Sequence, residues 1–281
     1  MVELSIITIN LNDKVGLSRT IDSIINQDFK EFELIIIDGG SSDGSFEVIE
    51  QNKANINYWV SEKDNGIYDA MNKGVEKANG NYLLFLNSGD YLISNEALNY
   101  DFSLFDHDIL YGHLTFQNNG KFYTSVYNDI LDLGFFFRTT LPHGSTFIKK
   151  ELFSKYGKYR LDFQIVSDWI FFLERILVDK CSTLHLDKPV SVFEIGGIST
   201  RPENQIKVKL ERLNYIESKL PEMAISYIRK SLEIEEKYKN LGIYISELQT
   251  SHQAEINNLK RLKGFKLLKK INNIFDRLHS I

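Results

Sequence analysis

The chain has 281 residues, which is enough for one large domain or for one domain with an appendage. Its formal charge of −5 gives no reason to expect nucleic acid as a partner, and its single cysteine excludes an intrachain disulfide. No apolar stretch approaches the roughly 20 residues that span a bilayer, and the first ten residues lack the basic flank of a signal peptide, so we expect a cytoplasmic protein.

The first third of the chain alternates apolar, β-branched runs with helical patterns. Strands are predicted at residues 3–10, 32–38, 56–62 and 82–87, and helices at 14–27, 43–52 and 66–79. This order predicts an α/β domain whose sheet is Rossmann-like, mostly parallel and flanked by helices.

The pattern becomes mixed after the fourth predicted strand. A hairpin is predicted within residues 108–126, a buried helix at 167–177 and a strand at 190–195. Beyond these elements, glycine and strand signals nearly vanish. The sequence therefore predicts a catalytic domain over residues 1–203 and a helical C-terminal extension over 204–281.

The last part of the extension has a distinct character. Residues 259–281 carry seven Lys or Arg against one acid, with apolar residues recurring at helical spacing. This pattern predicts a basic amphipathic helix. Such a helix suits an anionic membrane surface, but its apolar stripe equally suits packing on the catalytic domain or self-association with another subunit.

Polar residues follow all four strands of the first third. The first strand ends in Thr8 and Asn10, the second in residues 38–43, the third runs to Asp64, and the fourth ends in residues 87–90. In an open α/β sheet, ligands bind beyond the carboxyl ends of the strands. The sequence therefore predicts a crevice whose rim is rich in hydrogen-bond acceptors.

The acceptors at this rim suit two tasks. Carboxylates can accept hydrogen bonds from a nucleobase or ribose, and they can hold a divalent metal against a diphosphate. Neither a G-x-G-x-x-G fingerprint nor a P-loop follows the first strand, which argues against a nicotinamide dehydrogenase or a P-loop ATPase. Because Mg²⁺ often takes only one or two carboxylates, Asp90 alone could suffice as a metal ligand.

Six stretches, in this order over residues 1 to about 200, make the chain resemble a family 2 inverting glycosyltransferase: "SIITINLNDKVGLSRTIDSIINQ", "FELIIIDGGSSDGS", "WVSEKDNGIYDAMNKG", "GNYLLFLNSGDYL", "HGSTFIKKELF" and "SDWIFFLER". The resemblance implies the A-type nucleotide-sugar fold and a nucleotide-sugar donor, usually a UDP-sugar. It does not cover the last 80 residues.

The resemblance also implies roles for donor-site residues. Seven residues match positions of the family's donor site: Thr8 and Asn10 against the nucleoside, Asp38, Gly39 and Ser41 at the base, and Asp64 and Asn72 beside the ribose and phosphates. The metal-binding D-x-D element is matched by Asn87, Ser88, Gly89 and Asp90. Because Asn87 and Gly89 depart from the pattern, Asp90 is the only carboxylate left to meet Mg²⁺ or Mn²⁺.

The acceptor side is matched by two residues. Asp168 matches the family's catalytic base, and Ser167 replaces the glutamate that usually precedes it. In a single inverting displacement, the base takes the proton of the acceptor hydroxyl while the nucleoside diphosphate departs. His143 lies in the stretch that matches the acceptor-side loop, where we expect it to assist.

The predicted function is transfer of a hexosyl or N-acetylhexosaminyl group from a nucleotide-diphosphate donor to a hydroxyl of a glycan or lipid-linked glycan. The resemblance implies bacterial surface-polysaccharide assembly, and a membrane-bound tail would place the chain at the inner face of the plasma membrane. Two alternatives stay open. One is a sugar-phosphate nucleotidyltransferase, although the region after the first strand matches its glycine-rich basic loop poorly. The other is a catalytically silent sugar-nucleotide binder, which is compatible with a metal-binding element that keeps only one carboxylate.

Overall fold

The computed structural model describes residues 2–102, 105–118, 120–197, 200–219 and 237. The chain divides into two compact units, Met1–Tyr215 and Ile216–Ile281, and the fold below is that of the first. The predicted boundary after residue 203 stays a prediction, and the basic segment 259–281 lies outside the described residues. Within the described residues, no helix combines the length and apolarity needed to cross a membrane.

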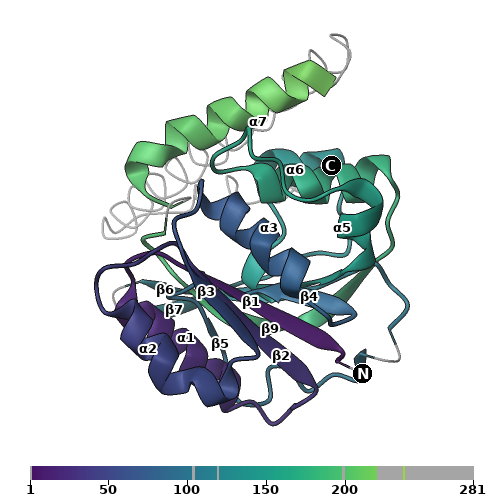
Figure 1. Ribbon diagram of the computed structural model, residues 1–281. Coiled ribbons are helices and arrows are strands. Elements are labelled where there is room, and N and C mark those ends of the chain that lie inside the picture. The colour runs from purple at the N-terminus through teal and green to yellow at the C-terminus, as the bar shows by residue number, and fades with distance from the viewer. Residues whose placement is uncertain (1, 103–104, 119, 198–199, 220–236, 238–281) are drawn as a thin grey trace, which may run out of the picture. The chain divides into compact units, whose positions relative to one another are not determined.

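The first four strands form the parallel half of the sheet (Figure 1). In spatial order they are β3 (Tyr58–Ser61), β2 (Phe32–Asp38), β1 (Leu4–Asn10) and β4 (Tyr82–Phe85). β1, β4 and most of β2 are fully buried, as their nearly continuous apolar runs require in a sheet covered on both faces. Asn10 pairs in register with Asp38, so the polar strand ends lie at one level.

Three helices connect these strands and cover both faces of this half (Figure 1). They are α1 (Lys14–Ile25), α2 (Ser45–Asn52) and α3 (Ile67–Lys77). Because alternate strand residues point to opposite faces, Ile6 joins the core that contains Leu17 of α1, while Ile7 lies against Gly74 of α3. The predicted alternation of strands and helices is confirmed, with a short 3-10 turn, η1 (Lys53–Asn55), before β3.

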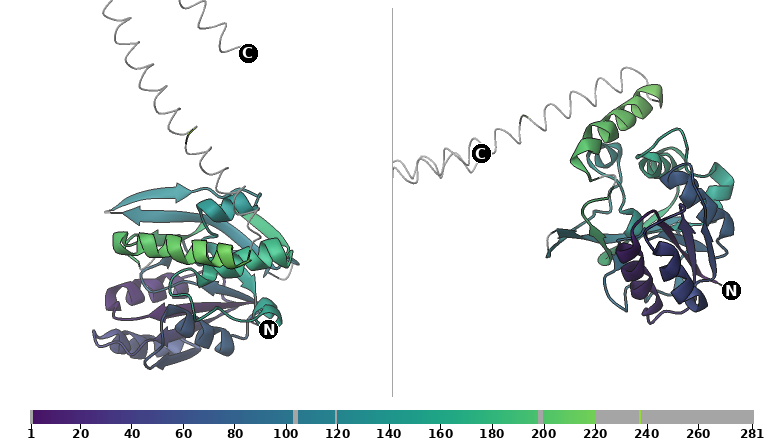
Figure 2. Two further views of the ribbon diagram at one scale, coloured as in Figure 1. Left: turned by 90° about the horizontal axis from the view of Figure 1, so that it is seen from above. Right: turned by 60° about the vertical axis from the view of Figure 1, so that its left-hand side comes forward.

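The second half of the sheet is mixed. Its strands are β5 (Tyr91–Leu92), β6 (Ile109–Asn118), β7 (Lys121–Ser125), β8 (Thr146–Lys149) and β9 (Thr183–Glu194). β8 lies antiparallel between β4 and β6, while β9 runs parallel to β6 and antiparallel to β5. The predicted hairpin is confirmed as β6 and β7, which project beyond the other strands (Figure 2). β9 begins seven residues before the predicted strand, because Asp187 and Pro189 mask its apolar pattern.

The helical elements of the second half are α4 (Leu133–Arg138), η3 (His143–Ser145), α5 (Glu151–Tyr156), α6 (Ser167–Leu173), the π-helical turn η4 (Glu174–Val178), η5 (Pro202–Asn204) and α7 (Gln205–Lys219). An aromatic cluster joins α5 and α6 to β4, with Phe153 stacked on Phe171 at 4.7 Å and edge-on to Tyr159 at 5.3 Å. Phe85 of β4 lies 5.4 Å from the ring of Tyr159. The cluster covers the same sheet face as α3.

Candidate active site

The carboxyl ends of β1, β2 and β3 are joined through one buried carboxylate, that of Asp38. Its Oδ1 accepts hydrogen bonds from Asn10 Nδ2 at 2.7 Å and Ser41 Oγ at 2.5 Å, and its Oδ2 accepts from the Ser41 backbone N–H at 2.9 Å and Ser61 Oγ at 2.5 Å. Burial alone would raise the pKa of Asp38, but these four hydrogen bonds outweigh it and lower the pKa. Asp38 is therefore an ionised brace beneath the strand ends.

This brace brings together three residues predicted for the donor site: Asn10, Asp38 and Ser41. Both oxygens of Asp38 are used within the protein, and the side chain is fully buried, so its contact with a base stays a prediction. Ser61 was missed by the sequence reasoning. It ends β3 in direct register with Asp38, which is the signal that could have found it.

Gly39 and Asp64, also predicted for the donor site, lie side by side at the end of β2. A Cβ atom at Gly39 would lie 2.5 Å from Asp64 Oδ2, so a side chain at position 39 would displace this carboxylate from its present position. Asp64 Oδ1 accepts a hydrogen bond from the Gly66 backbone N–H at 2.9 Å. The Asp64 carboxylate therefore takes the place that a side chain at position 39 would fill.

Three side-chain oxygens at these strand ends are buried and have no hydrogen-bond partner among the described residues: Thr8 Oγ1, Asn10 Oδ1 and Asn87 Oδ1. Buried polar atoms in folded proteins nearly always have a partner. The three come from the carboxyl ends of the neighbouring strands β1 and β4, the edge at which open α/β sheets bind their ligands.

The turn at residues 87–90 is held in place by helix α1. The Asp90 backbone N–H donates to the Asn87 carbonyl at 3.0 Å, and the Ser88 backbone N–H ties the turn to β1. Thr20 Oγ1 donates to the Asp90 carbonyl at 2.6 Å and accepts from the Gly89 N–H at 3.1 Å. The four matched residues therefore form one fixed turn beyond β4.

The Asp90 side chain lies in an unusual electrostatic setting. Burial is the main cause that raises its pKa to about 8, and the nearby carboxylates of Glu194 and Asp13 raise it further. The Glu194 backbone N–H and the Arg19 guanidinium act in the opposite direction and lower the pKa. A cation bound next to Asp90 would therefore stabilise the ionised form of its carboxylate. Together with the unpartnered Asn87 Oδ1, it offers the hard oxygen ligands that Mg²⁺ and Mn²⁺ take, so the residues present fit such an ion.

Three neighbours of Asp90 were missed by the sequence reasoning. Asp13 caps α1 by accepting from the Gly16 N–H at 3.0 Å, and Arg19 lies one to two helical turns further along. Arg19 forms an ion pair with Glu194 and lies over the Tyr91 ring at 4.8 Å. Glu194 ends β9, and only the pairing of β5 with β9 brings it here, so no local pattern reveals it.

Asp168, the predicted base, lies in the first turn of α6 and is partly exposed. The Tyr68 hydroxyl lies 2.7 Å from its Oδ1 and 2.6 Å from the Ile165 carbonyl oxygen. Because a charged acceptor makes the stronger hydrogen bond, Tyr68 holds the Asp168 carboxylate at a fixed angle. Burial first, and then the charge of Asp168, raise the Tyr68 pKa well above its usual value.

His143 lies in an aromatic pocket, where Tyr159 packs against Tyr68, the partner of Asp168. Its ring stacks on Phe85 at 4.6 Å, and its Nε2 lies 2.8 Å from the Tyr159 hydroxyl. Burial lowers the His143 pKa to about 4, although the Asp168 charge opposes this shift. His143 is therefore neutral at physiological pH, and Tyr159 and Tyr68 connect it to Asp168, the other residue predicted for catalysis.

Helix α7 supplies a further cation that the sequence reasoning missed. Arg212 lies over the Trp169 ring at 5.1 Å. Burial lowers the Arg212 pKa, and the Asp168 carboxylate opposes the shift. Next to Asp168, Ser167 Oγ is buried with no partner among the described residues. The environment of the predicted base thus combines a fixed carboxylate, a cation and an unused hydroxyl.

Asn72 lies in α3, and both ends of its amide are used by one residue. Its Nδ2 donates to the Tyr159 carbonyl at 2.8 Å, and its Oδ1 accepts from the Tyr159 N–H at 3.0 Å. Asn72 therefore clamps the loop that places Tyr159 beside His143. Its predicted contact with the ribose or phosphates stays a prediction.

A cavity of about 620 Å³ opens at the other end of the sheet. It is lined by residues that precede or begin strands β1 and β4, among them Glu3, Asn79, Gly80 and Tyr82. None of the predicted site residues lines it. Because ligands of open α/β sheets bind at the carboxyl ends, this cavity is not the candidate site.

The chain is similar in sequence to several glycosyltransferases. The PGL/p-HBAD biosynthesis glycosyltransferase of Mycobacterium bovis strain BCG is 30% identical over 203 residues, which are 69% of this chain and 78% of the relative. A glycosyltransferase described as uncharacterized, from Haemophilus influenzae, is 29% identical over 206 residues, covering 70% of this chain and 80% of the relative.

Solved structures share the fold. S. aureus TarS 1–349 in complex with UDP has a TM-score of 0.57 at 18% identity, covering 79% of this chain and 68% of that one. Against a longer TarS chain the TM-score is 0.59, but the match spans only 41% of that chain. The mannosyltransferase PcManGT of Pyrobaculum calidifontis, in complex with GDP-Man and Mn²⁺, has a TM-score of 0.55 at 13% identity. The match covers 74% of this chain and 60% of that one.

The fold is therefore the A-type nucleotide-sugar fold expected from the sequence. The sequence profile of glycosyl transferase family 2 matches residues 5–149, more than half of the chain. The matched region contains β1 to β4, the Asp38 brace and the turn that carries Asp90. The chain belongs to glycosyltransferase family 2.

Proposed function

We propose that this glycosyltransferase moves a sugar from a UDP-sugar to a hydroxyl of a glycan or lipid-linked glycan, with inversion and with Asp168 as the base. The observation that carries the proposal is the set of unpartnered buried oxygens of Thr8, Asn10 and Asn87 at the carboxyl ends of β1 and β4. Neighbours in structure with UDP and with UDP-GlcNAc bound support a UDP-linked hexosyl or N-acetylhexosaminyl donor.

The chemistry at the base follows from its surroundings. As the acceptor hydroxyl attacks the anomeric carbon, its proton passes to Asp168, and the nucleoside diphosphate leaves from the opposite face of the sugar. Tyr68 engages Oδ1 of Asp168 and leaves Oδ2 to take the proton. Neutral His143 adds no competing charge, while Arg212 on α7 places a cation near the Asp168 carboxylate.

A divalent ion completes the donor side. When bound, Mg²⁺ or Mn²⁺ supplies the positive charge that stabilises the departing diphosphate. Asn87 Oδ1 and the Asp90 carboxylate would hold the ion, and Thr20 fixes their turn through its two hydrogen bonds. The Mn²⁺ in the complex of the Pyrobaculum mannosyltransferase supports this choice of ion.

We place the activity in the assembly of a bacterial surface glycan, at the cytoplasmic face of the plasma membrane. The named role of the mycobacterial relative in PGL/p-HBAD biosynthesis supports a lipid-linked acceptor. Liposome flotation tests the membrane part, comparing the full chain with a chain ending near residue 255. Equal recovery of both in the soluble fraction rejects it.

Product analysis tests the reaction. The purified chain is incubated with UDP-sugars and GDP-sugars, with Mn²⁺ or Mg²⁺, and the released nucleotide is identified. We expect UDP, and an inverted anomeric configuration in the product by NMR. Release of pyrophosphate would indicate a nucleotidyltransferase instead, and binding without any release would indicate a silent sugar-nucleotide binder.

A further inference from the structure

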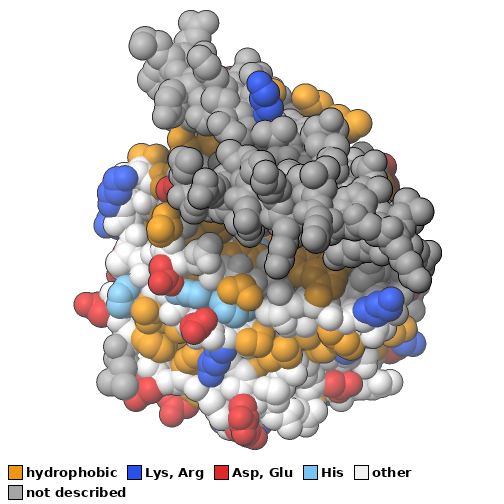
Figure 3. Space-filling view, turned by 180° about the vertical axis from the view of Figure 1, so that it is seen from behind, with side chains coloured by type: hydrophobic (Ala, Val, Ile, Leu, Met, Phe, Trp, Pro, Cys, Tyr) orange, Lys and Arg blue, Asp and Glu red, His pale blue; other side chains and the backbone are white. Residues whose placement is uncertain are grey.

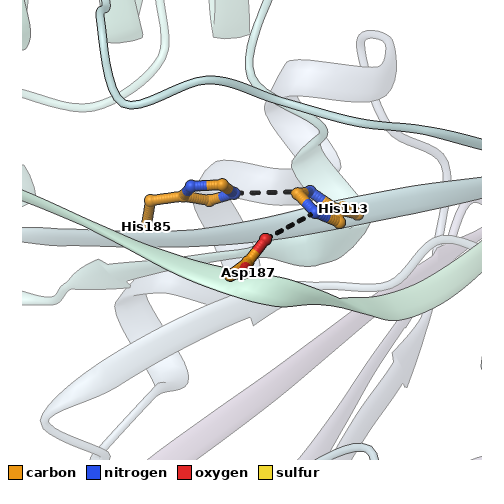
Figure 4. A group of neighbouring side chains, drawn as sticks. All are labelled: His113, His185 and Asp187. Carbon is orange, nitrogen blue, oxygen red and sulfur yellow. Dashed lines mark hydrogen bonds and ion pairs between the residues drawn. The ribbon is translucent and has the colours of Figure 1, made fainter.

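Strands β6 and β9 hold a cluster of side chains that the proposed reaction does not use: His113, His185 and Asp187 (Figure 4). The pairing of the two strands shifts register on either side of His113. Gly112 allows the close approach, because a Cβ atom there would lie 2.6 Å from the Lys188 carbonyl oxygen. Bulges of this kind re-aim side chains and are frequent beside functional sites.

The backbone at Asp187 is also unusual. Its φ is +41°, a conformation that non-glycine residues seldom adopt and that costs free energy unless the surroundings impose it. The strained residue presents an exposed carboxylate beside the His113 ring, with Oδ1 at 3.3 Å from Nε2. Seen from behind, histidine and acidic side chains lie together on this face of the molecule (Figure 3).

The hydrogen bonds of the two rings fix where their protons lie. His185 Nδ1 lies 2.7 Å from Asp129 Oδ1, and a carboxylate can only accept, so His185 carries its proton on Nδ1. The Tyr127 backbone N–H donates to His113 Nδ1 at 3.3 Å, so that nitrogen carries a lone pair. His185 Nε2 and His113 Nδ1 face each other across 3.3 Å, so a cation between them, a metal ion or a shared proton, completes the pair.

The distance between these two nitrogens suits a metal ion bound to both. Zinc–nitrogen bonds of about 2.05 Å to two atoms 3.3 Å apart enclose an angle of about 107°, close to tetrahedral. One nitrogen of each histidine and one Asp187 oxygen all lie within 4.8 Å of one another. Two histidines, a carboxylate and one water make a common zinc ligand set.

We propose that His113, His185 and Asp187 bind a divalent transition-metal ion of the zinc class. Binding replaces the long Tyr127 contact, and Asp129 orients His185 from the far side of its ring, the carboxylate–histidine–metal arrangement that strengthens such sites. The carboxylates of Asp129 and Asp187 offset the charge of the ion. Nitrogen ligands favour zinc over Mg²⁺, whereas the turn that carries Asp90 offers only oxygens.

The ion would fasten β6 to β9, since His113 comes from β6 and the other two ligands from β9. The test uses the full chain, stripped with a chelator, without nucleotide. Zn²⁺ binding is measured by calorimetry and thermal unfolding, and Co²⁺ is added separately to look for the intense visible absorption of a tetrahedral site. We expect a melting temperature that rises with Zn²⁺ concentration and the tetrahedral Co²⁺ spectrum.

Variants locate the site. His185→Gln and Asp187→Asn should weaken Zn²⁺ binding at least tenfold, and Asp129→Asn should weaken it about 10- to 100-fold. These positions are on the surface or partly exposed, so the test does not depend on replacing the buried His113. His107→Gln, a histidine outside the cluster, is the matched control and should bind Zn²⁺ normally.

Two outcomes would overturn the proposal. One is Zn²⁺ binding that is equally tight in the unchanged chain and in His185→Gln, which would place the ion elsewhere. The other is an unchanged melting temperature and no Co²⁺ absorption at saturating metal, in which case a shared proton is what holds the two rings together. Neither outcome depends on the activity of the enzyme.

Discussion

The two halves of the sheet reach their functional residues by different routes. In the half made by β1 to β4, each of β1, β2 and β3 is followed in sequence by a helix, and the polar residues that end these three strands, Asn10, Asp38 and Ser61, lie in register. In the half made by β5 to β9, residues far apart in the chain are brought together by strand pairing. Glu194 comes near Asp90 through the β5–β9 pair, and His185 comes near His113 through the β6–β9 pair.

We call the half made by β1 to β4 the donor half and the half made by β5 to β9, with its helices, the acceptor half, after their proposed roles. The donor half is built from residues close in sequence, and the acceptor half from residues that only tertiary packing brings together. Parallel strands share one carboxyl edge, so polar strand ends are brought together by topology alone. A mixed sheet has no such rule, and its sites depend on register shifts and bulges. Damage to the donor half should therefore change nucleotide binding and folding, whereas damage to the acceptor half should change turnover.

The largest effect is expected from Asp168→Asn. Removal of the proposed base should lower kcat by roughly 10²- to 10⁴-fold while leaving the thermal shift caused by UDP unchanged, because the donor half is intact. The rate of nucleotide release measures kcat, and melting curves with and without UDP measure the thermal shift. Asp162→Asn, which removes only an exposed ion pair with Arg160, is the control. Turnover above a tenth of normal would contradict the assignment.

The next effect is expected from Asp38→Ala. The change removes four hydrogen bonds to a buried anion and leaves the Ser61 hydroxyl without its partner, so the free energy of unfolding should fall by about 3 kcal/mol. Urea unfolding measures it. Asp22→Ala, at an exposed site on α1, should stay within about 0.5 kcal/mol of the unchanged chain. Equal stability of the two variants would contradict the role of Asp38 in bracing the donor half.

A smaller effect concerns pH and the acceptor half. Folding holds His143 neutral, with its pKa lowered from 6.5 to about 4. This contribution to stability is fully present above pH 6.5 and is lost as pH falls through 6.5 toward 4. Between pH 7 and pH 5 the loss should be about 2 kcal/mol.

His143→Gln should remove that loss, since glutamine does not titrate and can keep a polar contact with the Tyr159 hydroxyl. Urea unfolding at pH 7 and pH 5 measures both chains, and the difference between them isolates the histidine from all other groups. If the variant loses as much stability at pH 5 as the unchanged chain, burial of a neutral His143 is wrong.

The smallest effect is expected at Asn87. Asn87→Ala removes the unpartnered oxygen and should weaken Mn²⁺-dependent UDP binding about tenfold, whereas Asn87→Asp adds a carboxylate beside Asp90 and should strengthen it. Calorimetry with and without Mn²⁺ measures both. Asn81→Ala, which lies before β4 and bonds to Glu3, is the control. Identical Mn²⁺ dependence in all three variants would separate Asn87 from the metal.

Much of the donor half could be predicted from the sequence, because each of its signals is local. The bounds of β2 were predicted to the residue, and those of β1 and α1 to within two residues. What could not be predicted is how each polar group is used. Asp38 looked like a ligand contact, but the protein itself supplies four donors to it, and the partner Ser61 lies 23 residues away.

For the acceptor half, the sequence predicted individual elements and residues but not the contacts between them. The pattern around Asp168 indicated a buried helix, which is confirmed, while its role as the base stays a prediction. Tyr68, Arg212 and Glu194 reach their positions from remote elements. The histidine cluster carries no spacing signal, since its two rings are 72 residues apart. Such sites depend on tertiary packing, which a single sequence does not display.

Helix α7 sets a practical limit on how this enzyme can be shortened. Glu211 accepts the backbone N–H groups of Gln164 and Ile165 at 3.2 and 3.0 Å, directly before α6, and Tyr215 bonds to Glu174 just after it. A protein cut at residue 203 would lack both anchors, and the helix that bears Asp168 would lose its support at either end. Fragments meant for crystallisation or assay should therefore keep α7 whole.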